Sequence, residues 1–166
     1  MCAEPESTGK SVARSAVRLT CDFHDDVAYL SFGEQRRGPV RTVVCGIGDG
    51  AEVVGIDVDE NANRVLGLDF GHHARYLFRW LYERSPESAE VVVDLTYEPI
   101  ADVARVDLLS GEAGLPATWS QAECDRGRWR LSFGVTKGIG LVALVMPAAR
   151  SQLPPEVIAR APRVAR

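Results

Sequence analysis

The stretch VRLTCDFHDDVAYLSF, residues 17–32, returns 76 positions later as VDLTYEPIADVARVDL, residues 93–108. Six of the sixteen aligned positions are identical. The identical pairs are Val17 and Val93, Leu19 and Leu95, Thr20 and Thr96, Asp26 and Asp102, Val27 and Val103, and Ala28 and Ala104. A repeat at one fixed period indicates two copies of the same supersecondary unit.

Both stretches also carry the periodicity of a β-hairpin. Apolar residues alternate with polar ones over residues 17–23 and again over residues 91–97, which is typical of half-buried strands. After a polar turn the alternation resumes over residues 28–32 and 104–108. Each copy is therefore predicted to open with a hairpin.

The rest of the first copy extends this pattern. Val40 to Ile47 and Glu52 to Asp59 read as two more strands, and a further alternating run ends at Phe70. From His73 to about Arg84 the apolar period becomes helical, and the side chains placed on one predicted helical face are Tyr76, Leu77, Trp80 and Leu81. This predicted helix links the two copies.

The second copy repeats the plan with changes. Strands are predicted at about residues 90–97, 102–109, 117–124 and 128–133. Ile139 to Met146 is apolar on both faces, so it is either a central strand covered on both sides or an interface strand. A short helix is predicted over Glu156 to Ala161 because Pro155 suits a first helical turn.

These patterns predict an α+β fold that is mainly antiparallel β. Two tandem hairpin-rich repeats, each of about four strands plus a short helix, would pack as a pseudo-twofold sandwich or partly closed barrel. The first repeat spans residues 15–86 and the second residues 87–166, in one compact domain. Residues 1–14 are polar and predict a flexible N-terminal arm.

Composition and charge narrow the function classes. A formal net charge of −4 argues against a nucleic-acid binder that relies on phosphate neutralisation, and the cluster of Arg36, Arg37 and Arg41 reads as a solvated loop. Ile139 to Pro147, the longest apolar stretch, is too short to span a bilayer. The N-terminal residues have no apolar core of a secretory signal. We therefore expect a cytoplasmic protein without a membrane partner.

The sequence carries no recognisable cofactor or metal signature. The four cysteines have no CxxC spacing and are expected to be reduced. The glycines after Ile47 resemble a phosphate loop but precede an alternating segment, so a hairpin turn is favoured. Asp57, Asp59 and Asn61 match the first ligand spacings of a calcium loop, but Ala62 and Leu68 do not match its later positions, so a polar hairpin tip is favoured. We expect no cofactor and no metal.

Each copy resembles the small bacterial family known as domain of unknown function 2283. The opening motif, Tyr-Asp-x-x-x-Asp, is matched at Tyr97 to Asp102, and the acidic-tipped closing hairpin is matched at Ile56 to Asp69. Cys21 replaces the opening tyrosine in the first copy, Arg105 replaces a second-strand tyrosine, and the second copy lacks the acidic tip and the Gly-x-Glu strand. The resemblance implies a fold and no known activity or catalytic residues.

Two sets of residues are candidates for a site. The adjacent His72 and His73 fall where a strand meets a helix, which suits proton transfer, and the competing interpretation is that they are polar surface residues. Tyr29 and Arg105 occupy matching strand positions and could bind an anionic or enolic ligand across a pseudo-twofold axis. Tyr76, which is near the histidine pair in sequence, is a further candidate for ligand binding. The competing interpretation is that Tyr29 and Arg105 are ordinary exposed side chains.

The favoured function is a cytoplasmic bacterial accessory protein that binds a small molecule or a partner protein without catalysis. The alternative is a cofactor-independent cyclase, isomerase or lyase of small-molecule biosynthesis, acting in a cavity between the repeats with one acid or base. A third hypothesis is homodimerisation through Ile139 to Met146.

Overall fold

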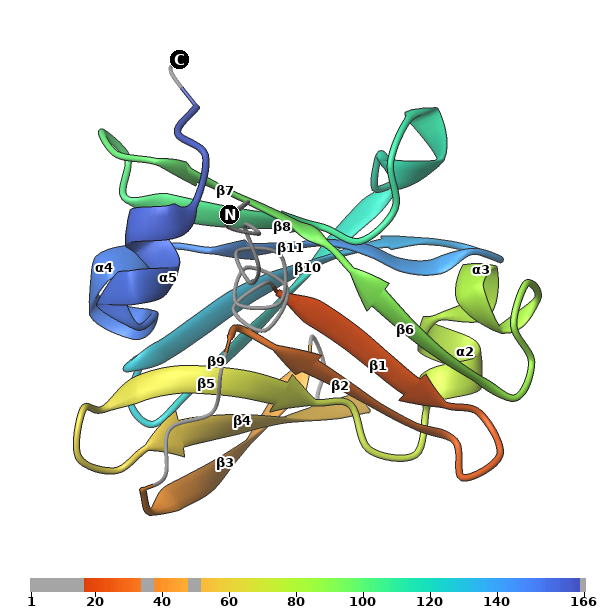
Figure 1. Cartoon of the computed structure of the whole chain (residues 1–166), viewed down its shortest axis with the longest axis horizontal. Helices are drawn as coiled ribbons and strands as arrows, with labels where there is room; N and C mark the ends of the chain where they lie inside the picture. Colours follow the sequence, from red (N-terminus) through yellow and green to blue (C-terminus); the bar gives the residue numbers. More distant parts are fainter. Residues whose placement is uncertain (1–16, 34–37, 48–51, 165–166) are drawn as a thin grey trace, which may run out of the picture.

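The computed structural model describes residues 17–33, 38–47 and 52–164. Within these residues eleven strands form one sheet, in the order β6-β1-β2-β5-β4-β3-β9-β10-β11-β8-β7 (Figure 1). The strands are β1 (Arg18–Asp22), β2 (Val27–Ser31), β3 (Val40–Ile47), β4 (Glu52–Asp59), β5 (Arg64–Asp69), β6 (Ser88–Val92), β7 (Asp94–Glu98), β8 (Val103–Asp107), β9 (Thr118–Cys124), β10 (Trp129–Thr136) and β11 (Gly140–Met146). All the pairings between these strands are antiparallel, as predicted.

The sheet curls into a nearly closed, barrel-like shape. Its two edge strands, β6 and β7, are separated in the chain by Val93 alone. This continuous sheet matches the predicted partly closed barrel better than a two-layer sandwich. Alternate residues of each strand point inward and form one core, in which the Phe70 and Phe133 rings meet edge to face at 6.3 Å.

The order of strands in the first half of the sheet recurs in the second half. Residues 18–69 give the order β1-β2-β5-β4-β3, and residues 94–146 give β7-β8-β11-β10-β9. The bounds of β7 and β8 lie 76 positions after those of β1 and β2. The two halves therefore meet in the middle of the sheet, where β3 lies beside β9.

A disulfide reinforces this meeting point. The recorded register between β3 and β9 places Ile47 opposite Ala122, and Cys45 and Cys124 are bonded with their Cα atoms 5.5 Å apart. The expectation that the cysteines are reduced is therefore wrong for this pair. Cys21 is free and buried.

Short helices lie at opposite ends of the barrel (Figure 1), and the helix predicted over residues 156–161 is present one residue earlier. They are α2 (Ala74–Leu77), α3 (Arg79–Tyr82), α4 (Ala149–Gln152), α5 (Pro155–Arg160) and the 3₁₀ turn η1 (Glu112–Gly114). The single helix predicted from His73 breaks at Phe78, whose φ of −119° and ψ of 44° are not helical. The break buries Phe78 and turns Tyr76 outward, so Tyr76 is 68% exposed. The prediction that Tyr76 shares one helical face with Leu77, Trp80 and Leu81 is therefore wrong, because those three side chains are buried.

Two features of the second half also differ from the prediction. The strand predicted over residues 90–97 is interrupted at Val93, because its first part pairs with β1 and its second part with β8. Helix α4 was not predicted.

The doubly apolar strand β11 lies between β10 and β8, and residues 141–144 are buried within the single chain. Its interior position accounts for the apolar character of both faces, and dimerisation through Ile139 to Met146 stays a prediction.

Some predictions concern residues outside the described ranges. These are the N-terminal arm at residues 1–14, Arg36 and Arg37 of the basic cluster, and Gly48 and Gly50 of the glycine-rich turn. The strands on either side of that turn, β3 and β4, form an antiparallel hairpin, as favoured. Among the described residues, no helix has the length and apolar character needed to cross a membrane. The cytoplasmic location stays a prediction.

Candidate functional site

The predicted catalytic histidines are exposed at the end of β5. His73 is the residue before α2, and its side chain makes no hydrogen bond to the helix. Neither His72 nor His73 lines either of the two larger pockets described below. Their role in proton transfer stays a prediction.

Matching aspartates fasten the helices to the hairpins. The Asp26 carbonyl accepts a hydrogen bond from the Ala74 amide at 3.3 Å, and its carboxylate accepts one from the Arg75 amide at 2.8 Å. Asp26 adopts a positive φ of 59°, which Asp tolerates better than most residues. This turn therefore holds the first residues of α2.

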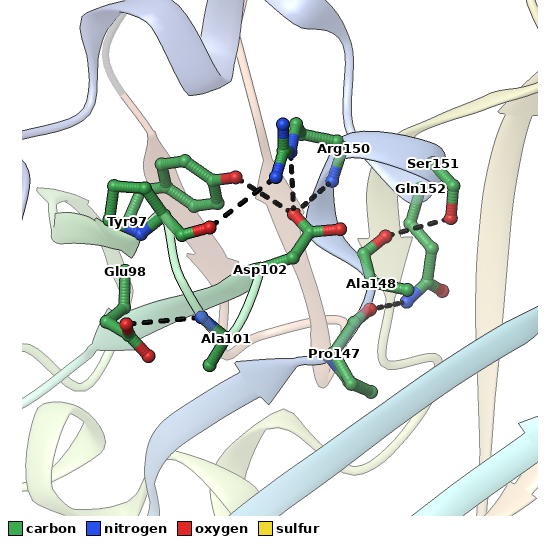
Figure 2. Close-up of polar contacts among 10 residues, drawn as sticks. Tyr97, Glu98, Ala101, Asp102, Pro147, Ala148, Arg150, Ser151 and Gln152 are labelled. Carbon is green, nitrogen blue, oxygen red and sulfur yellow. Dashed lines mark hydrogen bonds and ion pairs between the residues drawn. The ribbon is translucent and has the colours of Figure 1, made fainter.

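The second half repeats the arrangement, with the aspartate 76 positions later and the helix residues 75 positions later. The Asp102 carbonyl accepts from the Ala149 amide at 2.9 Å. The Asp102 carboxylate accepts from the Arg150 amide at 3.0 Å (Figure 2). The φ of Asp102 is 55°. The guanidinium groups match as well, because Arg75 and Arg150 donate to the carbonyls of Phe23 and Pro99, which also lie 76 positions apart.

The two halves differ at one buried position of these hairpins. In the second half the Tyr97 hydroxyl donates to the Asp102 carboxylate at 3.0 Å (Figure 2). Burial raises the pKa of Tyr97, the hydrogen bond to Asp102 and its charge raise it further, and Arg150 opposes the shift. In the first half Cys21 takes this position, and burial raises its pKa to about 12. Because neither Tyr97 nor Cys21 lines either larger pocket, both side chains belong to the packing.

Each pair of helices packs against a hairpin of the other half. The Trp80 amide donates to the Ile139 carbonyl at 3.1 Å, and its indole Nε1 donates to the Leu141 carbonyl at 2.9 Å. A Cβ atom on Gly140 would lie 2.2 Å from the Leu77 carbonyl oxygen. The β10–β11 hairpin therefore lies directly against α2 and α3, and we call this contact the open junction.

The equivalent contact joins α4 and α5 to the β4–β5 hairpin, and we call it the closed junction. The Arg128 guanidinium donates to the Asn63 carbonyl and to the Ser151 carbonyl, both at 2.8 Å, and lies 4.1 Å from the Trp129 ring centroid. Burial and the positive charge of Arg64 lower the pKa of Arg128. Two smaller pockets remain here, one of about 20 Å³ between the hairpin and Pro154–Glu156 and one of about 190 Å³ lined by Arg128, Ser151 and Gln152.

The open junction instead holds a groove of about 390 Å³. Position 52, which lies 76 residues before Arg128, is a glutamate on the groove wall. Leu77, Val135 and the glycines of the β10–β11 hairpin supply apolar surface. The polar lining residues are Glu52, Tyr76, Arg79, Thr118, Ser120, Thr136 and Lys137.

The charges in this groove favour an anion. The Arg79 Nε atom pairs with Glu83 at 2.9 Å, but both side chains are more than half exposed, so the pair is weak. Lys137 is exposed and has no ion pair with any described residue. Two cations and one carboxylate, Glu52, therefore line the groove, beside hydroxyl groups that can donate hydrogen bonds.

The structure does not bring Tyr29 and Arg105 into a shared site. The Tyr29 hydroxyl donates to Asp57 at 3.0 Å across Gly67, where a Cβ atom would lie 2.2 Å from the hydroxyl. The Arg105 Nε atom pairs with Asp107 at 2.7 Å. Strands β1, β6 and β7 separate their strands, β2 and β8, around the closure of the sheet. Of the predicted ligand-binding residues, Tyr76 is the one that lines a larger pocket.

The acidic tip of the β4–β5 hairpin is engaged in the fold. Asp57 accepts hydrogen bonds from Tyr29 and Thr42, and the Asp59 carboxylate accepts from the amides of Asn61 and Ala62. The described residues contain no cluster of three or more His, Cys, Asp or Glu side chains suited to a metal ion. The antiparallel β4–β5 pairing and the hydrogen bonds of Asp59 within the turn match the hairpin tip that the sequence favoured.

Sequence reasoning missed Glu52, Arg79, Lys137 and Arg128 as determinants of the junctions. The repeat contained a usable signal, because pairing residue n with n+76 sets Glu52 against Arg128. A reversal of charge between matched positions marks a place where the copies differ in their contacts. The groove itself could not be found this way, since its lining residues come from six different strands and helices.

Comparison of the chain with family models, curated proteins and solved structures finds no match. The resemblance to domain of unknown function 2283 therefore stays a prediction, and function is argued from the geometry of the open junction.

Proposed function

We propose that the protein binds a small organic anion in the groove of the open junction and acts as an accessory binding protein without catalysis. The observation that carries the proposal is the difference in volume between two matched places in the fold. The groove at the open junction measures about 390 Å³, whereas the closed junction holds two smaller pockets of about 20 Å³ and about 190 Å³. A binding site explains why one junction remains open.

This proposal includes the origin of the two halves by tandem duplication. The recurring strand order supports it, as do the matched hydrogen bonds of Asp26 and Asp102 to the helices. After duplication the closed junction would have kept only a packing role. The open junction would then have been free to acquire ligand-binding groups.

The lining residues define the ligand class. Lys137 and Arg79 offer ammonium and guanidinium donors, which bind carboxylate or phosphate oxygens. Leu77 and Val135 offer apolar contact, and the Tyr76 ring at the rim offers a flat surface for a planar group. The volume lies in the range of about 300–1,000 Å³ typical of small-molecule sites. We therefore infer a carboxylate with an aromatic or planar apolar body.

The packing of the interior supports binding at this groove over cyclisation deep inside the barrel. Phe70 and Phe133, one from each half, are almost completely buried, and their ring centroids lie 6.3 Å apart. Phe78 packs against Phe70 at 5.2 Å between ring centroids. Aromatic side chains thus fill the barrel interior, so a cyclase would have to hold its substrate in a groove between the halves, such as that of the open junction.

The test is a titration of the full chain with benzoate and phthalate, followed by amide chemical shifts and by calorimetry. We expect saturable shifts at residues 76–79 and 136–140. Lys137→Ala should weaken binding about tenfold or more, because a hydrogen bond to a charged group contributes about 1.5–3 kcal/mol.

The matched control is Arg84→Ala, which removes an equal charge from an exposed residue that does not line the groove. If Arg84→Ala and Lys137→Ala weakened binding equally, the effect would depend only on the net charge of the protein, and the proposal would be contradicted. Absence of saturable shifts at the open junction with either probe would contradict it as well.

A further inference from the structure

A second pocket lies at the closure of the barrel, away from the open junction. It measures about 380 Å³ and runs along the edge of β7. Residues 94–96 form one wall, and Val157 and residues 160–162 form the other. Val17 and Val93, matched residues of the two halves, close one end.

The backbone of β7 is paired on this edge at both ends of the pocket. The Val93 amide donates to the Val17 carbonyl at 3.0 Å. The Tyr97 amide donates to the Pro162 carbonyl at 2.9 Å, and the Val164 amide donates to the Tyr97 carbonyl at 3.0 Å. The edge is therefore already used as a strand-pairing surface on either side of Leu95.

Leu95 lies between these two contacts, and its backbone amide and carbonyl must point to the same edge of β7. In an antiparallel pair, residues alternate between those whose amide and carbonyl point to the partner strand and those whose groups point away. Because Tyr97 directs its groups away from β8, Leu95, two residues earlier, does so too. Among the described residues, no backbone group forms a hydrogen bond with the amide or the carbonyl of Leu95. The pocket thus exposes one main-chain donor and one acceptor.

The surroundings of these groups are apolar, with charges at the mouth. Val93, Leu95, Val157 and Ala161 are 6–9% exposed, whereas many core residues are 0–2% exposed. Asp94 and Arg160 line the pocket, and neither has an ion pair with a described residue. A small apolar side chain would fit inside, with polar neighbours at the charged mouth.

We propose that this pocket binds an extended peptide segment, which adds to β7 as a short strand. The amide and carbonyl of one peptide residue pair with the carbonyl and amide of Leu95, and a neighbouring small apolar side chain enters the pocket. Backbone pairing supplies the affinity, and the pocket selects side chains such as valine. This site gives the protein a peptide ligand in addition to the anion of the open junction.

The test compares two blocked pentapeptides added to the full chain: acetyl-Thr-Val-Ala-Val-Thr-amide, and the same peptide N-methylated at its central residue. Methylation removes the donor but keeps the apolar side chains. We expect the first peptide to shift the amides of residues 93–97 saturably, and the methylated peptide to bind at least about tenfold more weakly.

A pocket-filling variant, Ala161→Leu, should also weaken binding of the first peptide while thermal unfolding shows a folded protein. Equal binding of both peptides would overturn the proposal, as would the absence of saturable shifts near Leu95. If Ala161→Leu does not fold, the comparison of the two peptides on the wild-type chain decides the question. Neither result depends on the groove of the open junction, which the benzoate titration tests separately.

Discussion

The open and closed junctions share one arrangement of helices and hairpin but differ in their side-chain contacts. In both, a pair of short helices held by an aspartate turn packs against the hairpin of the other half. At the closed junction Arg128 bridges two carbonyls, and the pockets there are smaller than the groove of the open junction. At the open junction Glu52, the matched residue, lines a groove. In a repeated backbone arrangement, a few side chains can therefore determine whether a junction is packed or holds a groove.

The largest effect is expected from loosening the open junction at Trp80. Trp80→Ala should lower the free energy of unfolding by about 3–5 kcal/mol, the usual cost of truncating a large buried aromatic side chain. Trp80→Phe keeps most of the packing but leaves the Leu141 carbonyl without its donor, so we expect a loss of about 1–3 kcal/mol. Urea unfolding measures both. A smaller loss for Trp80→Ala than for Trp80→Phe would show that Trp80 does not hold the junction.

The disulfide should rank next, because it joins the two halves where β3 lies beside β9. Cys45 and Cys124 are 79 residues apart, and breaking such a crosslink is expected to cost about 2–4 kcal/mol. The measurement is urea unfolding of the Cys45→Ser, Cys124→Ser double variant against the oxidised wild type. Cys21→Ser leaves the crosslink intact, so a reductant should lower its stability as it does for the wild type, whereas the double variant should not respond to reductant. Wild-type protein whose stability is also unchanged by reductant would contradict this role.

Substitutions at the matched pair Arg128 and Glu52 should separate the junctions. Arg128→Ala removes the donor of two carbonyls at the closed junction and should cost about 1.5–3 kcal/mol. Glu52→Ala should change stability by less than about 0.5 kcal/mol, as is usual for surface positions. Thermal and urea unfolding of both variants test this. Equal losses would mean that Arg128 does not fasten the closed junction.

The smallest effect concerns alkaline pH and the matched residues Cys21 and Tyr97. Burial raises the pKa of Cys21 from 9.0 to about 12, so the unfolded state releases this proton first as pH rises. The stabilisation is complete below pH 9 and is lost as pH rises from 9 towards 12. The pKa of Tyr97 is raised from 10.0, so its contribution is lost above pH 10.

Unfolding free energies measured on both sides of pH 9 check these directions. Cys21→Ala should remove the part of the decline that begins near pH 9, and Tyr97→Phe the part that begins near pH 10. A wild-type protein whose stability rises with pH through this range would have the opposite sign and refute the assignment.

The periodicity of the sequence predicted most of the sheet. Val40 to Ile47 and Glu52 to Asp59 are strands with the predicted bounds, because alternation reports directly which side of a strand is buried. The break at Phe78 was not predictable, since it depends on the contact of that ring with Phe70, which lies in another element. The Cys45–Cys124 bond escaped prediction for a similar reason, because it requires knowing that β3 lies beside β9.

The candidate site was predicted less well than the fold. Tyr76 was selected as a ligand-binding residue and lines the groove, but it reaches this position through a helix break rather than the expected helix. Tyr29 and Arg105 have separate partners. Lys137 sits in a tight turn that gave no sign of a site, because a groove between elements depends on how distant segments pack.

The amide chemical shifts of the full chain, followed during titration with benzoate, test the central claim most directly. The account predicts saturable shifts at residues 136–140 of the open junction, with none at the matched residues 60–64 of the closed junction. Shifts of equal size at both junctions, or at neither, would contradict it.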